Sequence, residues 1–222
     1  MNNTQISSNL FERMLNLTEP WAVSDIQLDT ENLRLTIKVN TEKRAKLPCP
    51  QCGRLCSKED HREERSWRHL DTMQFETIIK CRVPRINCSQ HGIISVKAPW
   101  ADSYSRFTEF FEQFAIDVLC TAKNIKAAAK LLRLSRDQVH EIQKRAVKRG
   151  LARRKQEKIT RLGIDEKSFL KGHSYVSLLN DLDQGCVLEV VEDRTQEAAE
   201  NLLKTSVSDE QKTQVEAIAM DM

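Results

Sequence analysis

Two short cysteine motifs constrain the fold of this chain more than any other feature. Each motif places two potential metal ligands on either side of a two-residue spacer, and each is followed by a glycine that allows a tight turn. The four ligands are Cys49 and Cys52 in CPQCG, and Cys88 and His91 in NCSQHG. Three thiolates and one imidazole form the tetrahedral set of a structural zinc site, which leaves no open position for a substrate. We therefore expect a zinc ribbon over residues 47–100.

The other cysteines have less regular surroundings. The chain has 7 cysteines, an odd number, and no signal-peptide pattern at its start, so a cytosolic metal site is favoured over a disulfide framework. Cys56 is a competing ligand that lacks a partner at the same spacing. Cys81 falls on the apolar face of the strand-like segment FETIIKCRV, and Cys120 and Cys186 lie in apolar runs, so we expect these three in the core.

The charge distribution divides the chain into three parts. The net charge is only +3, but residues 121–161 carry 14 Lys and Arg against 3 Asp and Glu, a net charge of +11. Residues 162–222 carry 5 against 13, a net charge of −8, and residues 1–120 are balanced. A basic block of this density is typical of nucleic-acid binding, although a solvated face or linker is the alternative. No apolar run approaches the roughly 18 residues that span a bilayer, so we expect no membrane partner and a cytoplasmic protein.

The segment NIKAAAKLLRLSRDQVHEIQKRAV, which begins at Asn124, predicts two helices joined by a turn at 133–135. In the first helix, Ile125, Ala128, Ala129 and Leu132 have the spacing of one buried face. Ser135 then begins a second helix with Gln138 three residues later, which is the pattern of a capping box. This arrangement is typical of a helix-turn-helix, whose second helix enters the major groove of DNA.

The side of the second helix opposite its apolar stripe supplies the candidate DNA contacts. Four residues are placed to reach base edges or nearby phosphates, namely Arg136, Asp137, His140 and Lys144. Four more are expected at phosphates only, namely Lys148, Arg149, Arg153 and Arg154. An ordinary helical hairpin with a solvated basic face is the alternative. The capping box, the spacing and the basic block together favour DNA binding.

Two aspartates stand at the ends of predicted strands in the acidic part of the chain. Asp165 follows the strand-like LGI, and Asp221 ends the alternating segment VEAIAMD. An isolated aspartate at a strand end usually forms a turn. Here the order is a strand with Asp, two hairpin strands, a helix, and a strand with Asp. This order is the opening of an RNase H-like fold, in which the first and fourth strands lie side by side and bring two metal-binding acids together.

These segments, taken together, resemble bacterial insertion-sequence transposases of the ISL3 type, which are DDE enzymes. The resemblance rests on CPQCG, on the WRHLD and CRVPRINCSQHG region, and on APWADSYSRFTEFFE, LLRLSRDQVHEIQKRAVKRGL, GIDEKSFLKGHSYV and AIAMDM. It implies binding to double-stranded DNA at the element's terminal inverted repeats, and cleavage and joining of DNA with two divalent ions, magnesium or manganese. It also implies that Asp165 and Asp221 are the first two catalytic acids, that the protein lies on bacterial nucleoid DNA, and that it can form a homo-oligomer.

The family's third acid, a glutamate on a later helix, has no counterpart before Met222. We therefore expect a truncated transposase whose catalysis needs a further segment, or alternatively a catalytically inactive DNA-binding protein that regulates or inhibits transposition. Glu166 should point to the other face of its strand and not replace the missing acid. The expected fold is multidomain α+β: an N-terminal helix and hairpin (1–46), a small zinc ribbon (47–100), a helix-turn-helix with a basic linker from Gly150 (101–158), and the first half of an RNase H-like domain (159–222).

Overall fold

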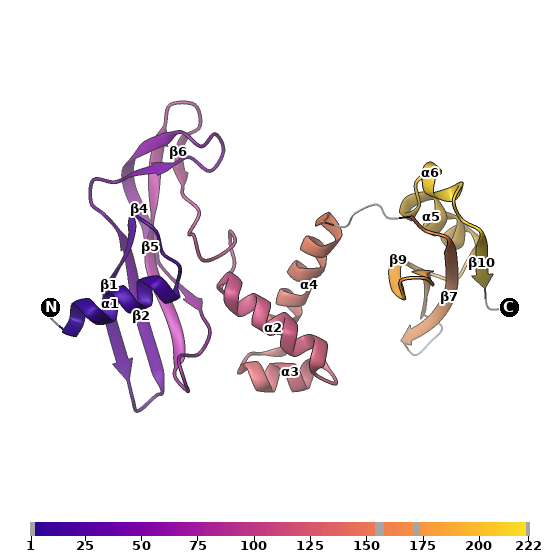
Figure 1. The fold of residues 1–222 in the computed structure, drawn as a ribbon, viewed down its shortest axis with the longest axis horizontal. Helices are drawn as coiled ribbons and strands as arrows, with labels where there is room; N and C mark the ends of the chain where they lie inside the picture. The colour runs from indigo at the N-terminus through magenta and orange to yellow at the C-terminus, as the bar shows by residue number, and fades with distance from the viewer. Residues whose placement is uncertain (1–2, 154–157, 171–173, 221–222) are drawn as a thin grey trace. The chain divides into compact units, whose positions relative to one another are not determined.

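The first part of the chain contains a mixed sheet that carries the two cysteine motifs. A computed structural model describes residues 3–153, 158–170 and 174–220, which fall into two compact units divided at Arg153 (Figure 1). The strands of the first unit are β1 (Trp21–Asp29), β2 (Arg34–Thr41), β3 (Lys46–Pro48), β4 (Leu55–Arg68), β5 (Glu76–Cys88) and β6 (Gly92–Ser95). They form one six-stranded sheet in the order β1-β2-β5-β4-β3, with β6 also paired to β5.

Strand β5 is central in this sheet, because it pairs with β2, β4 and β6, and the residues of its first half alternate between buried and more exposed. Thr77, Ile79, Cys81 and Val83 are buried on one face, as the period of two predicts. β2 pairs with β5 in parallel, so that Leu35 lies opposite Thr77. The N-terminal hairpin and the cysteine-rich segment consequently share one sheet and one hydrophobic core. Helix α1 (Asn3–Met14) packs on β1, where the Val23 amide donates to Glu12 Oε1 at 2.8 Å.

Three helices follow the sheet in the first unit. They are α2 (Glu109–Thr121), α3 (Ile125–Leu132) and α4 (Arg136–Arg153). α3 ends at Leu132, and the next residue, Arg133, has a left-handed backbone (φ 55°), which confirms the expected break between two helices. Ala128, Val139 and Ile142 are fully buried between the helices. Small and β-branched side chains at these positions allow close helix packing.

The structure corrects the expected start of the basic linker. Gly150 does not end the second helix of the motif, because α4 continues to Arg153. A glycine inside a helix costs only about 1 kcal/mol relative to alanine, which is too little to stop a helix that packs against its neighbours. Residues 154–157 lie outside the described part of the chain.

The second unit is a four-stranded sheet covered on one face by a helix. Its elements are β7 (Arg161–Leu170), β8 (Ser174–Asp181), β9 (Cys186–Glu192), α5 (Gln196–Ser206), the short α6 (Asp209–Lys212) and β10 (Ala217–Met220). The strand order is β10-β7-β8-β9, and β10 runs parallel to β7 with Met220 opposite Ile164. This confirms that the first and fourth strands of the unit are neighbours. Leu202 of α5 is fully buried together with Leu179 and Leu162 in a separate core.

β10 is an exposed edge of this second sheet. All four of its residues are exposed, among them Ile218 and Met220. An apolar edge strand presents unpaired backbone groups to solvent. Among the helices that the structure describes, none combines the length and the apolar character that crossing a membrane requires.

Candidate metal centre and nucleic-acid interface

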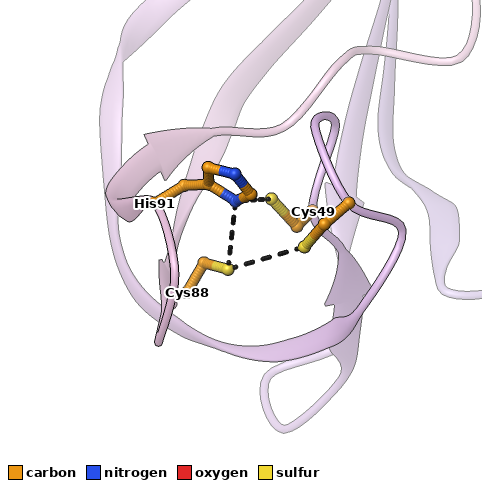
Figure 2. A group of neighbouring side chains, drawn as sticks. Cys49, Cys88 and His91 are labelled. Carbon is orange, nitrogen blue, oxygen red and sulfur yellow. Dashed lines mark hydrogen bonds between the residues drawn. The ribbon is translucent and has the colours of Figure 1, made fainter.

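The two cysteine motifs meet at one end of the first sheet. The ligand atoms of Cys49, Cys52, Cys88 and His91 all lie within 4.8 Å of one another. His91 Nδ1 is 3.6 Å from the Sγ atoms of both Cys49 and Cys88 (Figure 2). Cys52 Sγ is 3.7 Å from Cys88 Sγ. A tetrahedral zinc ion with bonds of about 2.3 Å to sulfur and about 2.0 Å to nitrogen requires separations of about 3.7 and about 3.5 Å. The donor set and its spacing therefore fit zinc.

The sheet itself brings the two motifs together. Cys49 directly follows β3, and Cys88 is the last residue of β5. The first turn is closed by the Gly53 amide, which donates to the Cys49 carbonyl at 2.8 Å, and Gly53 has a left-handed backbone (φ 71°). Gly92 begins β6 with a φ of 65° after the second turn. Only glycine adopts this conformation without a steric cost, so both turns require it.

Backbone amides also favour the thiolate form of these cysteines. Hydrogen bonds from the amides of Gln90 and then His91 hold the pKa of the Cys88 thiol at about 6. The amide of Gln51 lowers the pKa of Cys49 in the same way. Zinc binds the thiolate rather than the thiol. The folded turns therefore prepare two of the four ligands for the ion.

The remaining cysteines only partly follow expectation. Cys81 is buried, and burial raises the pKa of its thiol to about 12, so it is an inert core residue. Cys56 is also buried and donates to the Arg54 carbonyl at 3.3 Å. Cys120 and Cys186 are both exposed, which corrects their expected place in the core. Cys120 lies beside the groove between α2 and α4, and Cys186 begins an edge strand, so the apolar runs around them leave these side chains uncovered.

The predicted capping box begins α4. The Ser135 amide donates to Gln138 Oε1 at 2.9 Å, and the Gln138 amide donates to Ser135 Oγ at 3.2 Å. These reciprocal bonds satisfy two amide groups that a helix start otherwise leaves without partners. They also fix the direction in which the following residues leave the turn. Arg136 and Asp137 are exposed in this first turn of α4.

The structure separates the eight predicted DNA contacts into three groups. Five are exposed along α4, namely Arg136, Asp137, His140, Lys144 and Lys148. His140, Lys144 and Lys148 line a groove of about 440 Å³ together with Gln143, Val147 and Leu151. Arg153 is exposed at the end of α4, and Arg154 lies outside the described residues. Arg149, the third group, is only partly exposed and turns towards the protein.

Arg149 belongs to a buried ion-pair network that the sequence does not reveal. Its Nη1 lies 2.9 Å from Glu112 Oε2 and 3.4 Å from Asp102 Oδ2. Glu112 is buried in α2 and also binds Arg145 at 2.8 Å and Ser105 Oγ at 2.8 Å. A buried carboxylate requires such partners because desolvation otherwise disfavours its charge. The network joins α2 to α4 and gives Arg149 an internal partner.

A second polar contact joins the helices to the sheet. The Arg68 amide donates to the Arg106 carbonyl at 2.8 Å, and the Thr108 amide donates to the Arg68 carbonyl at 3.0 Å. His69 Nδ1 lies 2.9 Å from Thr108 Oγ1, which also caps the start of α2. Burial lowers the pKa of His69 to about 4. The zinc-type ribbon and the helix-turn-helix are therefore linked by buried hydrogen bonds as well as by the chain.

Asp165 lies exposed on β7 opposite Leu178 of β8. Its Oδ1 accepts a hydrogen bond from the Glu166 amide at 2.8 Å. Glu166 lies opposite the buried Ser177, so neighbouring residues alternate between the two faces of the sheet. Asp221 lies outside the described residues. Among those described, Asp165 belongs to no group of three or more potential metal ligands.

Comparison with known protein families assigns all three parts of the chain. Residues 46–91 match a family described as the zinc-finger of transposase IS204/IS1001/IS1096/IS1165. Residues 96–147 match the helix-turn-helix domain of transposase family ISL3, and residues 162–222 match the DDE family of the same elements, described as transposase. The three matches follow the order of the Cys and His cluster, the capped helix pair and the second sheet.

Individual relatives support the same assignment. The chain is 28% identical over 184 residues to the transposase for insertion sequence element IS1557 of Mycobacterium tuberculosis. This match covers 79% of this chain and 41% of the relative. It is 25% identical over 175 residues to the transposase for insertion sequence element IS1001 of Bordetella parapertussis, and this match covers 78% of this chain and 43% of that relative. The chain thus spans about two fifths of the length of these relatives. No solved structure matches it. Three domain matches in the family's order show that the chain belongs to the ISL3 family of insertion-sequence transposases.

Proposed function

We propose that this chain provides the DNA-end recognition of an insertion-sequence transposase, by binding the element's terminal inverted repeats in double-stranded DNA. The observation that carries the proposal is α4, which begins with a capping box and exposes a row of basic residues within the same unit as the zinc-type cluster. In this division of the chain, residues 47–100 form the zinc ribbon, 101–158 bind DNA and 159–222 belong to the catalytic domain. Residues 1–46 form a helix and hairpin that extend the ribbon's sheet.

α4 is the element that we expect in the major groove. Arg136, Asp137 and His140 lie near its start and are placed to read base edges. Lys144, Lys148, Arg153 and Arg154 would bind phosphates, whereas Arg149 contributes mainly through its pairing with Glu112. Two repeats at the two ends of an element favour a homo-oligomer that holds both, acting on nucleoid DNA in the bacterial cytoplasm.

A binding experiment tests this role for α4. Titration of the protein into a labelled duplex carrying a terminal repeat should show tighter binding than to an unrelated duplex. Lys144→Ala should weaken binding to both duplexes and reduce the slope of log affinity against log salt by about 1, because one phosphate contact is lost. Lys204→Ala is the matched control, since Lys204 is an exposed lysine paired with Glu200 in the acidic unit. Equal affinities of wild type and Lys144→Ala would exclude α4 as the binding helix.

The zinc assignment is tested by metal content. We propose that Cys49, Cys52, Cys88 and His91 hold one structural zinc ion, whose role is to join the two turns and not to act on a substrate. Purified wild type should carry one zinc per chain, and Cys88→Ser should lose it. Cys120→Ser, which changes an exposed thiol outside the cluster, should keep it. Retention of zinc by both Cys49→Ser and Cys88→Ser would overturn the assignment.

For the complete enzyme, we propose metal-dependent DNA cleavage and strand transfer in which Asp165 and Asp221 hold magnesium or manganese. Support comes from the parallel pairing of β7 and β10, in which Ile164 and Met220, the residues just before the two acids, lie opposite each other. In a two-metal site one ion activates the attacking oxygen and the other stabilises the leaving oxygen.

The alternative is a DNA-binding protein that regulates transposition without cutting. It rests on the features that point to DNA binding, namely the capped and basic helix α4 in the same unit as the Cys and His cluster. Incubation of this chain with terminal-repeat DNA and magnesium distinguishes the two. Nicking that Asp165→Asn abolishes would favour the enzyme. DNA binding without nicking, unchanged in Asp165→Asn, would favour the regulator.

A further inference from the structure

The turn between β4 and β5 exposes a large apolar side chain that the fold does not use. Met73 is 92% exposed and has a left-handed backbone, with φ at 58°. A non-glycine residue in this conformation costs free energy, and an exposed methionine returns none of it through burial. An outlier of this kind, held in place by its surroundings, is a reason to look for a function.

Its neighbours hold the turn in one conformation. The amides of Thr72 and Phe75 each donate to the other residue's carbonyl at 3.1 Å. Thr72 Oγ1 also lies 2.9 Å from Thr77 Oγ1, and Thr77 is fully buried in β5. These bonds leave the backbone of the turn little freedom. Met73 is therefore displayed on a rigid support, which is the requirement for a preorganised contact.

The turn is also attached to the helix-turn-helix. Arg133, the residue directly after α3, extends its Nη1 to 3.7 Å from Asp71 Oδ2 and 3.4 Å from the Gln74 carbonyl. Both partners belong to the β4–β5 turn, on either side of Met73. Arg133 precedes Ser135, the cap of α4, by only two positions. The turn that carries Met73 consequently lies beside the start of the helix proposed to enter the major groove.

The charge around the turn is compatible with a polyanion. Asp71 is its only acidic residue, and it is paired with both Arg68 and Arg133. Thr72 and Gln74 are uncharged, and the Arg133 side chain remains 52% exposed. A phosphate backbone passing this surface meets a neutralised carboxylate and a partly exposed guanidinium, so it is not repelled.

We propose that the β4–β5 turn is a second DNA-binding element, and that Met73 inserts into the minor groove next to the major groove that α4 enters. Proteins that bend DNA use methionine among their apolar wedges, which partly unstack a base step and bend the duplex towards the major groove. The inference rests on the proposed function, because it requires α4 to bind duplex DNA. It adds a contact that reads the deformability of the flanking base step rather than hydrogen-bonding groups.

The variant Met73→Gly tests this inference without harming the fold. It removes the side chain, and glycine suits a φ of 58°, so the variant should unfold at the same temperature as wild type or higher. The full chain is titrated into a mixed-sequence duplex with an A·T-rich centre and a dye at each end. Anisotropy reports affinity, and energy transfer between the dyes reports bending.

We expect Met73→Gly to bind about fivefold more weakly and to bend the duplex less, with an unchanged salt slope because no phosphate contact is lost. Met14→Ala, which truncates a half-exposed methionine in α1, should behave as wild type. Wild-type affinity and bending in Met73→Gly, combined with weak binding by Lys144→Ala, would overturn this inference and leave the proposed function intact. An absence of wild-type binding both to this duplex and to the duplex that carries a terminal repeat would overturn both proposals. If Met73 instead contacts a protein partner, Met73→Gly should bind and bend the duplex as wild type does, which overturns this inference.

Discussion

His69 shows how one residue can make the first unit sensitive to acid. Burial holds its pKa at about 4 in the folded chain, against an ordinary value of 6.5. The folded state therefore binds fewer protons than the unfolded state between these two values. Stability from neutral His69 is complete above about pH 6.5 and is lost as the pH falls towards 4.

This residue carries the first prediction. Between pH 6.5 and 4, wild type should lose up to about 3 kcal/mol of unfolding free energy more than His69→Gln, which cannot titrate but can still bond Thr108. Urea unfolding at a series of pH values measures the difference. If the stability curves of the two proteins run parallel across this range, the imidazole does not titrate as proposed.

At the scale of elements, Glu112 is the contact that holds α2 against α4. It is buried, whereas its partners Arg145 and Arg149 are each about one third exposed. Glu112→Gln should lower the unfolding free energy by about 2 kcal/mol, which is less than the roughly 3–5 kcal/mol of a fully buried pair because solvent reaches both guanidinium groups. Thermal or urea unfolding measures this. Glu141→Gln, which removes an exposed pair with Lys144, is the control and should change stability by no more than about 0.5 kcal/mol.

A substitution at Gly150 in α4 is expected to raise the unfolding free energy. It is helical and exposed, and a Cβ atom added there meets no atom within 4 Å. Gly150→Ala should therefore stabilise the first unit by about 0.5–1 kcal/mol, because alanine has the higher helix propensity. An increase in the midpoint of urea unfolding would support this. A decrease would mean that the backbone at this position must leave the helical conformation.

At the scale of the whole molecule, the separate cores of the two units predict separate responses to metal removal. A chelator that removes zinc should reduce hydrogen-exchange protection in β3, β5 and β6, whose ends carry the proposed ligands. Strands β7, β8 and β9 should keep their protection, because their core contains no residue of the first unit. Loss of protection in both units on chelation would show that they fold as one.

Much of this architecture could be predicted because its signals are local. The capping box at Ser135, the alternation in β5 and the strand order around Asp165 all depend on spacing along the chain. The inward turn of Arg149 could not be predicted, because a helical wheel places it among other basic residues and its acidic partners Glu112 and Asp102 lie 37 and 47 positions earlier in the chain. The continuation of α4 past Gly150 was missed for a similar reason, since packing outweighs one unfavourable residue.

The sequence by itself determined the four candidate ligands of the proposed zinc site, the helix-turn-helix and the family, because each is encoded by residue types at short fixed spacing. Only the tertiary structure decided how these parts act on one another. The sheet brings Cys49 to His91, Glu112 holds α4, and Arg133 places the β4–β5 turn beside the start of that helix. Such contacts join residues far apart in the chain, and burial and charge pairing select them only once the backbone has folded.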